Sequence, residues 1–326
     1  MHPKVSVVIT SFNQADTIRQ TIDSVMDQHC EFPFEIIIGD DCSTDNTSEI
    51  CEEYVNRYPG IFKLFFHKEN MGVGANFAFC VKQAAGEFIA VCAADDYWHN
   101  REKLKTQVRF FEDQPDYGLL YTDYNLLNLK TGKAINSFLK STKTAIYEGP
   151  GLIGSFFAGK VPVLTLTVMF RKELFDKYIP ADDFITYRFP LEDWPTWLIL
   201  SKYTRIGYMD ISTGTYRYGQ ESISHTTRYE KIKERFAREK PMYRYLCEMF
   251  PEDISYDEKG YESYVKSVLL NLAYQKSDYS AAKKYAGQMS ELGYKNFKSA
   301  CAKYWVTFKL FVLIKSLKKY YLGDRF

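Results

Sequence analysis

Residues 88–98, FIAVCAADDYW, decide the fold, because a short apolar run ends there in two adjacent carboxylates. The run is partly β-branched and lies between Gly86 and charged residues, which predicts a buried strand. In open α/β sheets, ligands bind outside the carboxyl ends of the strands. Asp95 and Asp96 would lie at such an end, where their hard oxygen donors suit Mg²⁺ or Mn²⁺. Alternatively, an aspartate here only caps a helix that begins near Arg101.

Upstream segments repeat the same arrangement. Residues 4–13 and 34–39 are apolar runs that end in polar turns, and residues at helical spacing follow each of them. A third run over residues 62–67 precedes the glycines of residues 70–76, where the backbone could approach a ligand closely. With residues 88–94, these runs make four strand-loop-helix units. Their order predicts an α/β fold with a Rossmann-like, mostly parallel sheet flanked by helices.

Apolar periodicity places a helix after the first of these strands. Ile18, Ile22 and Val25 recur at three- and four-residue spacing, so one face of this helix would pack on the sheet. A second helix is expected over residues 46–58, after the acidic turn of residues 40–47.

Five short motifs together resemble one enzyme family. They are residues 5–13, 40–47, 70–72, 95–98 and 191–194. Each motif alone is unspecific, but their shared order over roughly residues 4–225 is a strong signal. The chain resembles the inverting family 2 glycosyltransferases of the GT-A fold, in the bacterial surface-polysaccharide branch. This resemblance implies a GT-A type sheet.

The resemblance also implies a nucleotide pocket near the tips of the first strands. Thr10, Phe12 and Asn13 would line it, together with Asn76. Asp41 would accept a hydrogen bond from a ring N–H of a uracil-type base, for which a carboxylate is suited. Phe12 stands where tyrosine is common in the family, which retains ring stacking and loses a hydroxyl. Outside the family context, Asp41 would be an ordinary turn residue.

The resemblance assigns roles to two acidic pairs. Asp95 would lie near the ribose, and Asp96 would bind the Mn²⁺ or Mg²⁺ that bridges the diphosphate and neutralises the leaving group. Ala93 stands where relatives often carry an acidic residue, which predicts a weaker or more exchangeable metal. In the second pair, Glu192 and Asp193, the aspartate resembles the general base. It would take the proton of the acceptor hydroxyl as this attacks the anomeric carbon with inversion.

Asp193 has a second interpretation that the sequence leaves open. It precedes Trp194 and Pro195, so it can cap a helix whose apolar face holds Trp197. The helix dipole would lower the pKa of Asp193, whereas burial beneath Trp194 would raise the pKa toward that of a useful base. Capping does not exclude catalysis, and the sequence does not decide which effect on the pKa is larger.

The loop over residues 216–225 resembles the flexible segment that folds over the diphosphate in related enzymes. Arg217 would suit phosphate oxygens through its planar guanidinium. His225 is a candidate third metal ligand or phosphate contact, although most isolated histidines are neither.

Composition disfavours several other classes of protein. The chain has 42 Lys and Arg against 41 Asp and Glu among 326 residues, so no basic field points to nucleic acid. Its seven cysteines are scattered without CxxC spacing, which favours reduced thiols in a cytoplasm. No signal peptide is expected before Val5, and no apolar run reaches the roughly 20 residues that span a bilayer.

The sequence pattern becomes helical near residue 228. This change predicts a GT-A catalytic domain over residues 1–227 and an α-helical region over residues 228–326. The last helix, expected over residues 300–321, combines aromatic and aliphatic residues with lysines. Such a helix could contact the anionic inner face of the cytoplasmic membrane, where a lipid-linked acceptor waits, or pack on the catalytic domain or a second subunit.

These observations predict a metal-dependent inverting hexosyltransferase. It would move a sugar from a nucleotide-diphosphate donor, expected to be a UDP-sugar, to a hydroxyl of a glycan or lipid-linked acceptor in cell-surface polysaccharide biosynthesis. The alternative is a non-catalytic nucleotide- or sugar-binding module with a degenerate GT-A fold, which Ala93 keeps open. A nucleotidyltransferase is disfavoured because residues 11–14 lack a Gly-rich phosphate loop.

Overall fold

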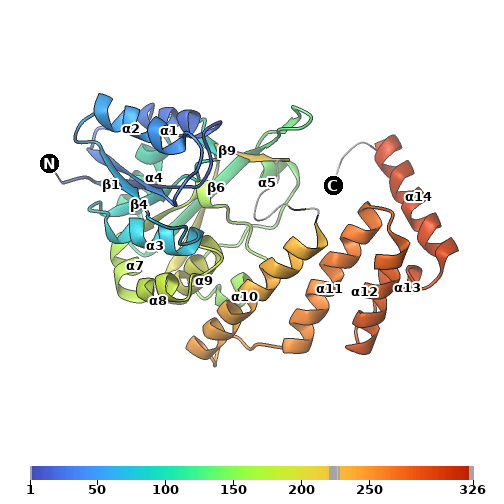
Figure 1. Cartoon of the computed structure of the whole chain (residues 1–326). Coiled ribbons are helices and arrows are strands. Elements are labelled where there is room, and N and C mark those ends of the chain that lie inside the picture. Colours follow the sequence, from blue (N-terminus) through green and yellow to red (C-terminus); the bar gives the residue numbers. More distant parts are fainter. Residues whose placement is uncertain (1, 220–225, 227, 323–326) are drawn as a thin grey trace. The chain divides into compact units, whose positions relative to one another are not determined.

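The computed structural model describes residues 2–219, 226 and 228–322, with side chains up to residue 313. The chain divides into two compact units, Met1–Gln220 and Glu221–Phe326. The first unit contains the sheet, and the second is built from helices (Figure 1). Each unit has its own hydrophobic core.

The first four strands of the sheet are parallel. They are β1 Val5–Ser11, β2 Phe34–Asp40, β3 Phe62–Phe66 and β4 Phe88–Val91. β1 pairs with β2 and β4, and β2 pairs with β3, all in parallel. The parallel arrangement predicted for these units is therefore confirmed, and their carboxyl ends meet along one edge of the sheet.

Beyond β4 the sheet becomes mixed. The further strands are β5 Tyr97–Trp98, β6 Tyr117–Asn128, β7 Ala134–Ile135, β8 Met169–Arg171 and β9 Arg205–Tyr218. Within the described residues the order is β3-β2-β1-β4-β8-β6-β9-β5, and β7 pairs with β6. β8 is antiparallel to β4 and β6, whereas β9 is parallel to β6. β5 is antiparallel to β9, so it places the residues after the acidic pair beside β9.

Helices flank the sheet of the first unit (Figure 1). They are α1 Ile18–Met26, α2 Thr47–Arg57, α3 Val73–Lys82, α4 Lys103–Asp113, α5 Phe138–Ser141, α6 Ile153–Phe157, the 3-10 turn η1 Thr165–Thr167, α7 Lys172–Tyr178, α8 Ala181–Thr186 and α9 Asp193–Tyr203. α1 buries Ile18, Ile22 and Val25 in the core, as their spacing predicted. The helix expected over residues 46–58 begins at Thr47 and ends at Arg57.

The described part of the second unit is helical. Its helices are α10 Tyr229–Met249, α11 Glu258–Gln275, α12 Tyr279–Glu291, α13 Phe297–Cys301 and α14 Trp305–Leu322. The Asp278 side chain caps α12 by accepting a hydrogen bond from the Ala281 N–H (3.0 Å). The single helix expected over residues 300–321 is interrupted, because α13 ends at Cys301 and α14 begins at Trp305.

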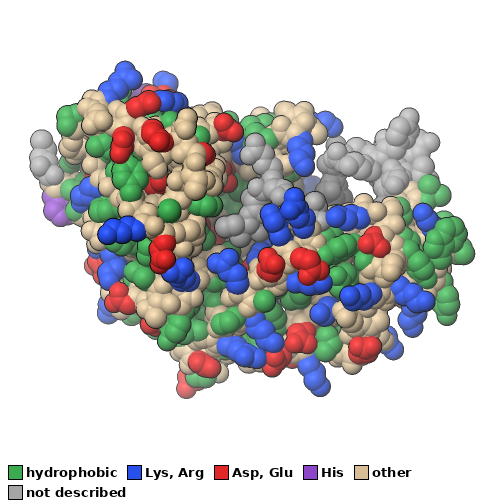
Figure 2. All heavy atoms as spheres, in the orientation of Figure 1, with side chains coloured by type: hydrophobic (Ala, Val, Ile, Leu, Met, Phe, Trp, Pro, Cys, Tyr) green, Lys and Arg blue, Asp and Glu red, His purple; other side chains and the backbone are tan. Residues whose placement is uncertain are grey.

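α14 carries apolar side chains on two sides. Phe308 and Phe311 pack in the core of the second unit. Val306, Leu310 and Leu313 instead have more than half of their surface exposed. Figure 2 shows hydrophobic side chains over the beginning of this helix, at the right of the view. Across the described residues, none of the helices has the combination of length and hydropathy that crossing a membrane demands.

Candidate active site

The first acidic pair follows β4 and is fixed against β1 and α1. The Ala94 N–H donates to the Thr10 carbonyl (3.3 Å). The Thr21 hydroxyl donates to the carbonyl oxygens of Ala94 (2.9 Å) and Asp96 (2.6 Å). Asp95 is half-buried, whereas only 2% of the Asp96 surface is exposed. Burial raises the pKa of both carboxyl groups, and the charge of Asp95 raises that of Asp96 further.

Arg217, near the end of β9, lies beside this pair. Its backbone N–H donates to Oδ1 of Asp96 (2.9 Å). Its guanidinium carbon lies 5.0 Å from the centre of the Tyr97 ring. Nε and Nη2 are buried, and no group in the described part of the chain accepts a hydrogen bond from them. Because unpaired buried donors are costly, this guanidinium marks a place where an anion would be stabilised.

The second acidic pair lies at the N-terminus of α9. Oδ1 of Asp193 accepts a hydrogen bond from the Trp194 N–H (2.6 Å), and Oδ2 accepts one from the Thr165 hydroxyl (3.0 Å). Burial raises the pKa of Asp193, although these hydrogen bonds act in the opposite direction. Burial is the largest of these effects and outweighs the hydrogen bonds. Asp193 thus begins a helix and also has the raised pKa expected of a base.

The two acidic pairs meet in space. Burial raises the pKa of Glu192 to about 8, with further contributions from the charges of Asp193 and Asp95. Glu192 is therefore mainly protonated at neutral pH. Burial also raises the pKa of the Tyr216 hydroxyl, and the charges of Asp96, Asp95 and Asp193 add to this shift. Three of the four carboxylates, Asp95, Asp96 and Asp193, therefore lie close enough to Tyr216 on β9 for their charge to act on its hydroxyl.

The loops after β1 and β2 are hydrogen-bonded to each other. Asn13 has a φ of 53°, a left-handed conformation that asparagine tolerates. Its N–H donates to Oγ of Ser43 (2.9 Å), and its Oδ1 accepts from the Thr44 N–H (2.7 Å). Phe12 is 44% exposed, so its ring is open to solvent, and Thr10 is half-buried.

Asp41 holds the loop after β3. Its carboxylate accepts hydrogen bonds from the backbone N–H groups of Met71 (2.7 Å) and Gly72 (2.9 Å). Its carbonyl accepts from Nδ2 of Asn70 (3.2 Å). Gly72 has a φ of 88°, a conformation that strongly favours glycine. Each carboxylate oxygen retains a lone pair, so Asp41 can support this loop and still accept a hydrogen bond from a ligand.

Asn76 lies beneath these loops. Its residue is 1% exposed, Nδ2 donates to the Gly39 carbonyl (2.8 Å), and Oδ1 contacts Nε2 of His67 (3.0 Å). The side chain therefore joins α3 to β2 and to the end of β3. Its polar groups are engaged with protein atoms.

The structure separates the predicted site residues into two groups. Asp95, Asp96, Asp193 and Arg217 meet around Tyr216. The nucleotide-pocket candidates Thr10, Phe12, Asn13, Asp41 and Asn76 lie on β1, on the adjoining loops or beneath them. His225 lies outside the described residues.

Two residues of this region were missed by sequence reasoning. Tyr216 directly precedes Arg217, so its place on the same strand was a usable signal. Thr165 lies on η1, distant in sequence from Asp193, and no motif marks it.

The acidic pair is suited to a divalent cation. In the described part of the chain, no group of three or more His, Cys, Asp or Glu side chains could hold a metal ion. Asp95 and Asp96 nonetheless supply two hard carboxylates whose ionisation is opposed by burial and, for Asp96, by its neighbour. A nearby cation would relieve both penalties. The donor set therefore fits Mg²⁺ or Mn²⁺ if substrate oxygens complete the coordination.

Comparison with known proteins identifies the family. The profile described as Glycosyl transferase family 2 matches residues 6–164. TuaG of Bacillus subtilis strain 168, named a putative teichuronic acid biosynthesis glycosyltransferase, is 30% identical over 225 residues, which cover 68% of this chain and 82% of TuaG. The chain belongs to glycosyltransferase family 2. The family predicted from the five motifs is therefore confirmed.

Some relatives of this family 2 chain match over a shorter span. An uncharacterized protein of Mycobacterium tuberculosis strain H37Rv is 43% identical over 112 residues, or 34% of this chain. The match covers 32% of that relative, so the chain spans about a third of its length.

Solved structures share the fold of this family 2 chain. Staphylococcus aureus TarS 1–349, solved in complex with UDP-GlcNAc, has a TM-score of 0.51 at 19% identity, covering 98% of this chain and 92% of TarS 1–349. Mannosyltransferase PcManGT from Pyrobaculum calidifontis, solved with GDP-Man and Mn²⁺, has a TM-score of 0.50 at 15% identity, covering 99% and 89%. At these identities the likeness establishes the fold. The predicted GT-A type architecture with a C-terminal helical region is confirmed.

Proposed function

We propose that this protein transfers a sugar from a UDP-sugar to a hydroxyl of a glycan or lipid-linked acceptor, with inversion and with a divalent metal, in cell-surface polysaccharide biosynthesis. The observation that carries the proposal is the proximity of the two acidic pairs to each other, with Arg217 bonded to Asp96 and its Nε and Nη2 without an acceptor among the described residues. Residues 1–227 would form the catalytic domain, and residues 228–326 the helical region.

The nucleotide would bind over the loops that follow β1, β2 and β3. The exposed ring of Phe12 can stack on a base, and Asp41 retains capacity to accept a hydrogen bond from it. Thr10 and Asn13 would line the same pocket, while Asn76 would support it from below. The UDP-GlcNAc complex of TarS supports uridine, and the GDP-Man complex of PcManGT makes guanosine the competing outcome.

The diphosphate would lie between the first acidic pair and Arg217. Asp96, with Asp95 near the ribose, would hold Mn²⁺ or Mg²⁺, and His225 is a further candidate ligand. The metal, when bound, neutralises charge that develops on the leaving diphosphate. Arg217 would donate to the phosphate oxygens through Nε and Nη2, which find no acceptor among the described residues.

Asp193 would act as the general base. Its carboxylate takes the proton of the acceptor hydroxyl while that oxygen attacks the anomeric carbon from the face opposite the diphosphate. The new C–O bond forms as the bond to the diphosphate breaks, so the configuration inverts. The pKa of Asp193, raised by burial, makes it a better proton acceptor than an exposed aspartate. Glu192, mainly protonated at neutral pH, can donate a hydrogen bond to a sugar oxygen.

The exposed side of α14 would contact the inner face of the cytoplasmic membrane. Val306, Leu310 and Leu313 are exposed beside Lys303 and Lys309. Residues 303–322 contain no Asp or Glu. A second copy of this basic surface would be repelled, whereas anionic lipid headgroups complement its charge.

Calorimetry and turnover test the proposal together. UDP, GDP, CDP and dTDP are titrated with and without Mn²⁺, and release of UDP from a panel of UDP-sugars is measured for the wild type and Asp193→Asn. Metal-dependent binding of UDP and loss of turnover in Asp193→Asn with intact binding are expected. Metal-dependent binding of UDP without turnover on any UDP-sugar and acceptor would favour the non-catalytic module.

A further inference from the structure

Three buried side chains donate hydrogen bonds to two consecutive carbonyl groups of η1. Nε1 of Trp98 donates to the Leu166 carbonyl (2.9 Å). Nζ of Lys103 and Nε2 of Gln107 both donate to the Thr167 carbonyl, at 3.0 and 2.9 Å. Nζ of Lys103 also donates to Oε1 of Gln107 (2.7 Å), which links the two donors. We call Trp98, Lys103 and Gln107 the η1 clamp.

The charge of Lys103 is unusual for a core position. The residue has no exposed surface, and its ammonium donates only to neutral oxygens among the described residues. It lies 5.1 Å from the centre of the Trp98 ring. Burial lowers the pKa of Lys103 to about 7. Because an apolar side chain of similar volume is often as stable at such a position, stability alone does not account for the lysine.

Two of the three carbonyl groups of η1 accept hydrogen bonds from the clamp. η1 is a three-residue 3-10 turn between two extended residues, Leu164 and Val168. Its first residue, Thr165, donates to Oδ2 of Asp193 (3.0 Å). The other oxygen of Asp193 accepts the Trp194 N–H of its own helix. The clamp therefore holds the turn whose Thr165 hydroxyl donates to Oδ2 of Asp193.

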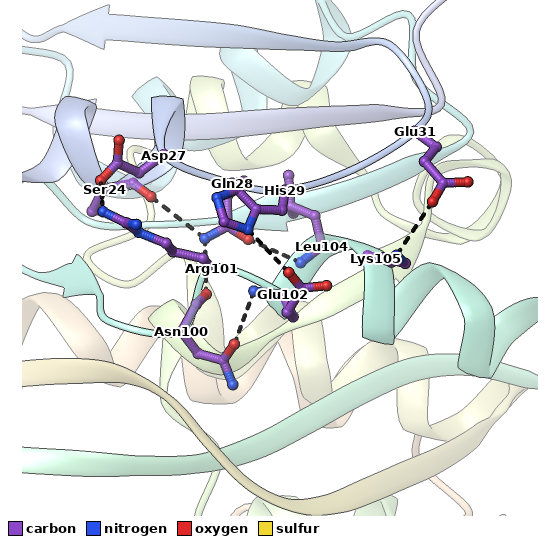
Figure 3. Close-up of polar contacts among 10 residues, drawn as sticks. All are labelled: Ser24, Asp27, Gln28, His29, Glu31, Asn100, Arg101, Glu102, Leu104 and Lys105. Carbon is purple, nitrogen blue, oxygen red and sulfur yellow. Dashed lines mark hydrogen bonds and ion pairs between the residues drawn. The ribbon is translucent and has the colours of Figure 1, made fainter.

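The clamp is also fixed relative to the first acidic pair. Trp98 lies two residues after Asp96. The backbone N–H of Trp98 donates to the Ser24 hydroxyl at the end of α1 (3.0 Å). The start of α4 is held by Gln28, whose Nε2 donates to the Asn100 carbonyl (2.9 Å) and whose Oε1 accepts the Leu104 N–H (3.1 Å) (Figure 3). One continuous segment thus carries the first acidic pair and the donors that hold η1.

We propose that the η1 clamp positions the general base. It keeps the hydrogen bond from the Thr165 hydroxyl to Asp193 in place, and so fixes Asp193 relative to Asp96, the proposed metal ligand. Lys103 is then a positioning residue, since it acts through η1 and Thr165 and touches no substrate. The inference rests on the proposed glycosyltransferase function, with Asp193 as its base.

Hydrogen exchange and turnover test this inference in the full chain. Lys103→Met and Gln107→Leu should speed exchange of the Thr167 and Val168 amides, which close η1. Both variants should lower kcat about tenfold, because the base is misplaced. The KM for the nucleotide-sugar donor should change less than about twofold, because the site that binds this substrate is unaffected. Lys105→Met, which removes an exposed lysine of the same helix, is the matched control and should behave as wild type.

The pH profile separates positioning from a merely structural role. The Thr165 hydrogen bond lowers the pKa of Asp193, so its loss should move the acidic limb of kcat to higher pH. Thr165→Val should produce the same shift, and Lys103→Met combined with it should add little further loss. Gln107→Leu carries the test if Lys103→Met fails to fold.

An unmoved acidic limb, unchanged exchange of η1, or a fully additive double variant would each overturn the inference. If Asp193→Asn remains active, the proposed base itself is wrong. If Asp193→Asn is inactive while the acidic limb of the kcat profile in the clamp variants stays where it is in the wild type, only the positioning role fails.

Discussion

The backbone N–H of Arg217 donates to Oδ1 of Asp96 over 2.9 Å, joining residues 121 positions apart in the chain. The end of β9 is therefore bonded directly to the candidate metal-binding carboxylate. The contact uses Oδ1, and no hydrogen bond to Oδ2 is seen among the described residues. The Arg217 guanidinium is held over Tyr97, and its Nε and Nη2 have no acceptor among the residues that the structure describes.

Asp96→Asn should retain the fold and lose the metal-dependent part of UDP binding. The amide oxygen can still accept the Arg217 N–H, but a neutral amide is a weak ligand for Mn²⁺. Titration calorimetry with UDP, with and without Mn²⁺, measures both effects. Asp113→Asn, at an exposed carboxylate of α4, should bind as wild type. Unchanged metal dependence in Asp96→Asn would remove Asp96 from the metal site.

Arg217→Met should weaken UDP binding by at least about tenfold, the scale of one charge-assisted hydrogen bond. Uridine binding should hardly change, because the guanidinium is assigned to phosphate oxygens. Thermal stability should not fall, because the change removes two buried donors that have no acceptor in the described part of the chain. Arg109→Met, at an exposed position of α4, is the control. Equal weakening of UDP and uridine would show that Arg217 shapes the whole pocket instead.

Asp193→Asn should lower kcat by on the order of 10²–10⁴ with donor binding intact, the range for loss of a general base. The reaction needs the deprotonated carboxylate, so wild-type kcat should rise with pH through the pKa of Asp193. Since burial raises that pKa, the rise should lie above the ordinary value of 3.8. Turnover at several pH values with one UDP-sugar measures it, and a flat profile would argue against this base.

Glu192→Gln should stabilise the protein at high pH. The pKa of Glu192 is about 8 in the folded state against an ordinary value of 4.5. Between these values the folded state binds more protons than the unfolded state, so the free energy of unfolding falls as pH rises. Glutamine does not titrate, so the variant lacks this pH dependence of the free energy of unfolding. The melting temperature of Glu192→Gln should exceed that of the wild type by at least about 2 °C at pH 8.5.

The same gap should be much smaller at about pH 5, where Glu192 is protonated in the folded state and the unfolded state has begun to take up the proton. Thermal unfolding at about pH 5 and pH 8.5 makes this comparison. Glu52→Gln, an exposed position on α2, should show no such pH dependence. An equal gap at both pH values would mean that glutamine acts through packing rather than charge.

Leu310→Ser combined with Leu313→Ser should weaken binding to vesicles that contain phosphatidylglycerol. Both side chains are 54% exposed on α14, so the change removes apolar surface without opening the core. Co-sedimentation with anionic and with zwitterionic vesicles measures the effect, and Thr307→Ser is the control. Unchanged vesicle binding, or a concentration-dependent mass in light scattering that the double substitution abolishes, would favour self-association.

Local sequence patterns were sufficient for the first half of the fold. The burial of Ile18, Ile22 and Val25 follows from helical spacing, and β1 to β4 follow from short apolar runs bounded by polar turns. The acidic pair could be placed close after β4 for the same reason, although the strand ends at Val91 and not at Ala94 as expected. Such features depend on neighbours within a few residues, so periodicity detects them.

The sequence by itself determined the family, the parallel units and the identity of the two acidic pairs. Only the tertiary structure decided that Arg217 bonds to Asp96, that Thr165 holds Asp193, and that burial outweighs the hydrogen bonds in setting the pKa of Asp193. The mixed parallel and antiparallel pairing of β8, β6 and β9 was likewise decided only by the tertiary structure. Desolvation and long-range hydrogen bonds depend on which distant segments come together, and no local pattern of side chains records that.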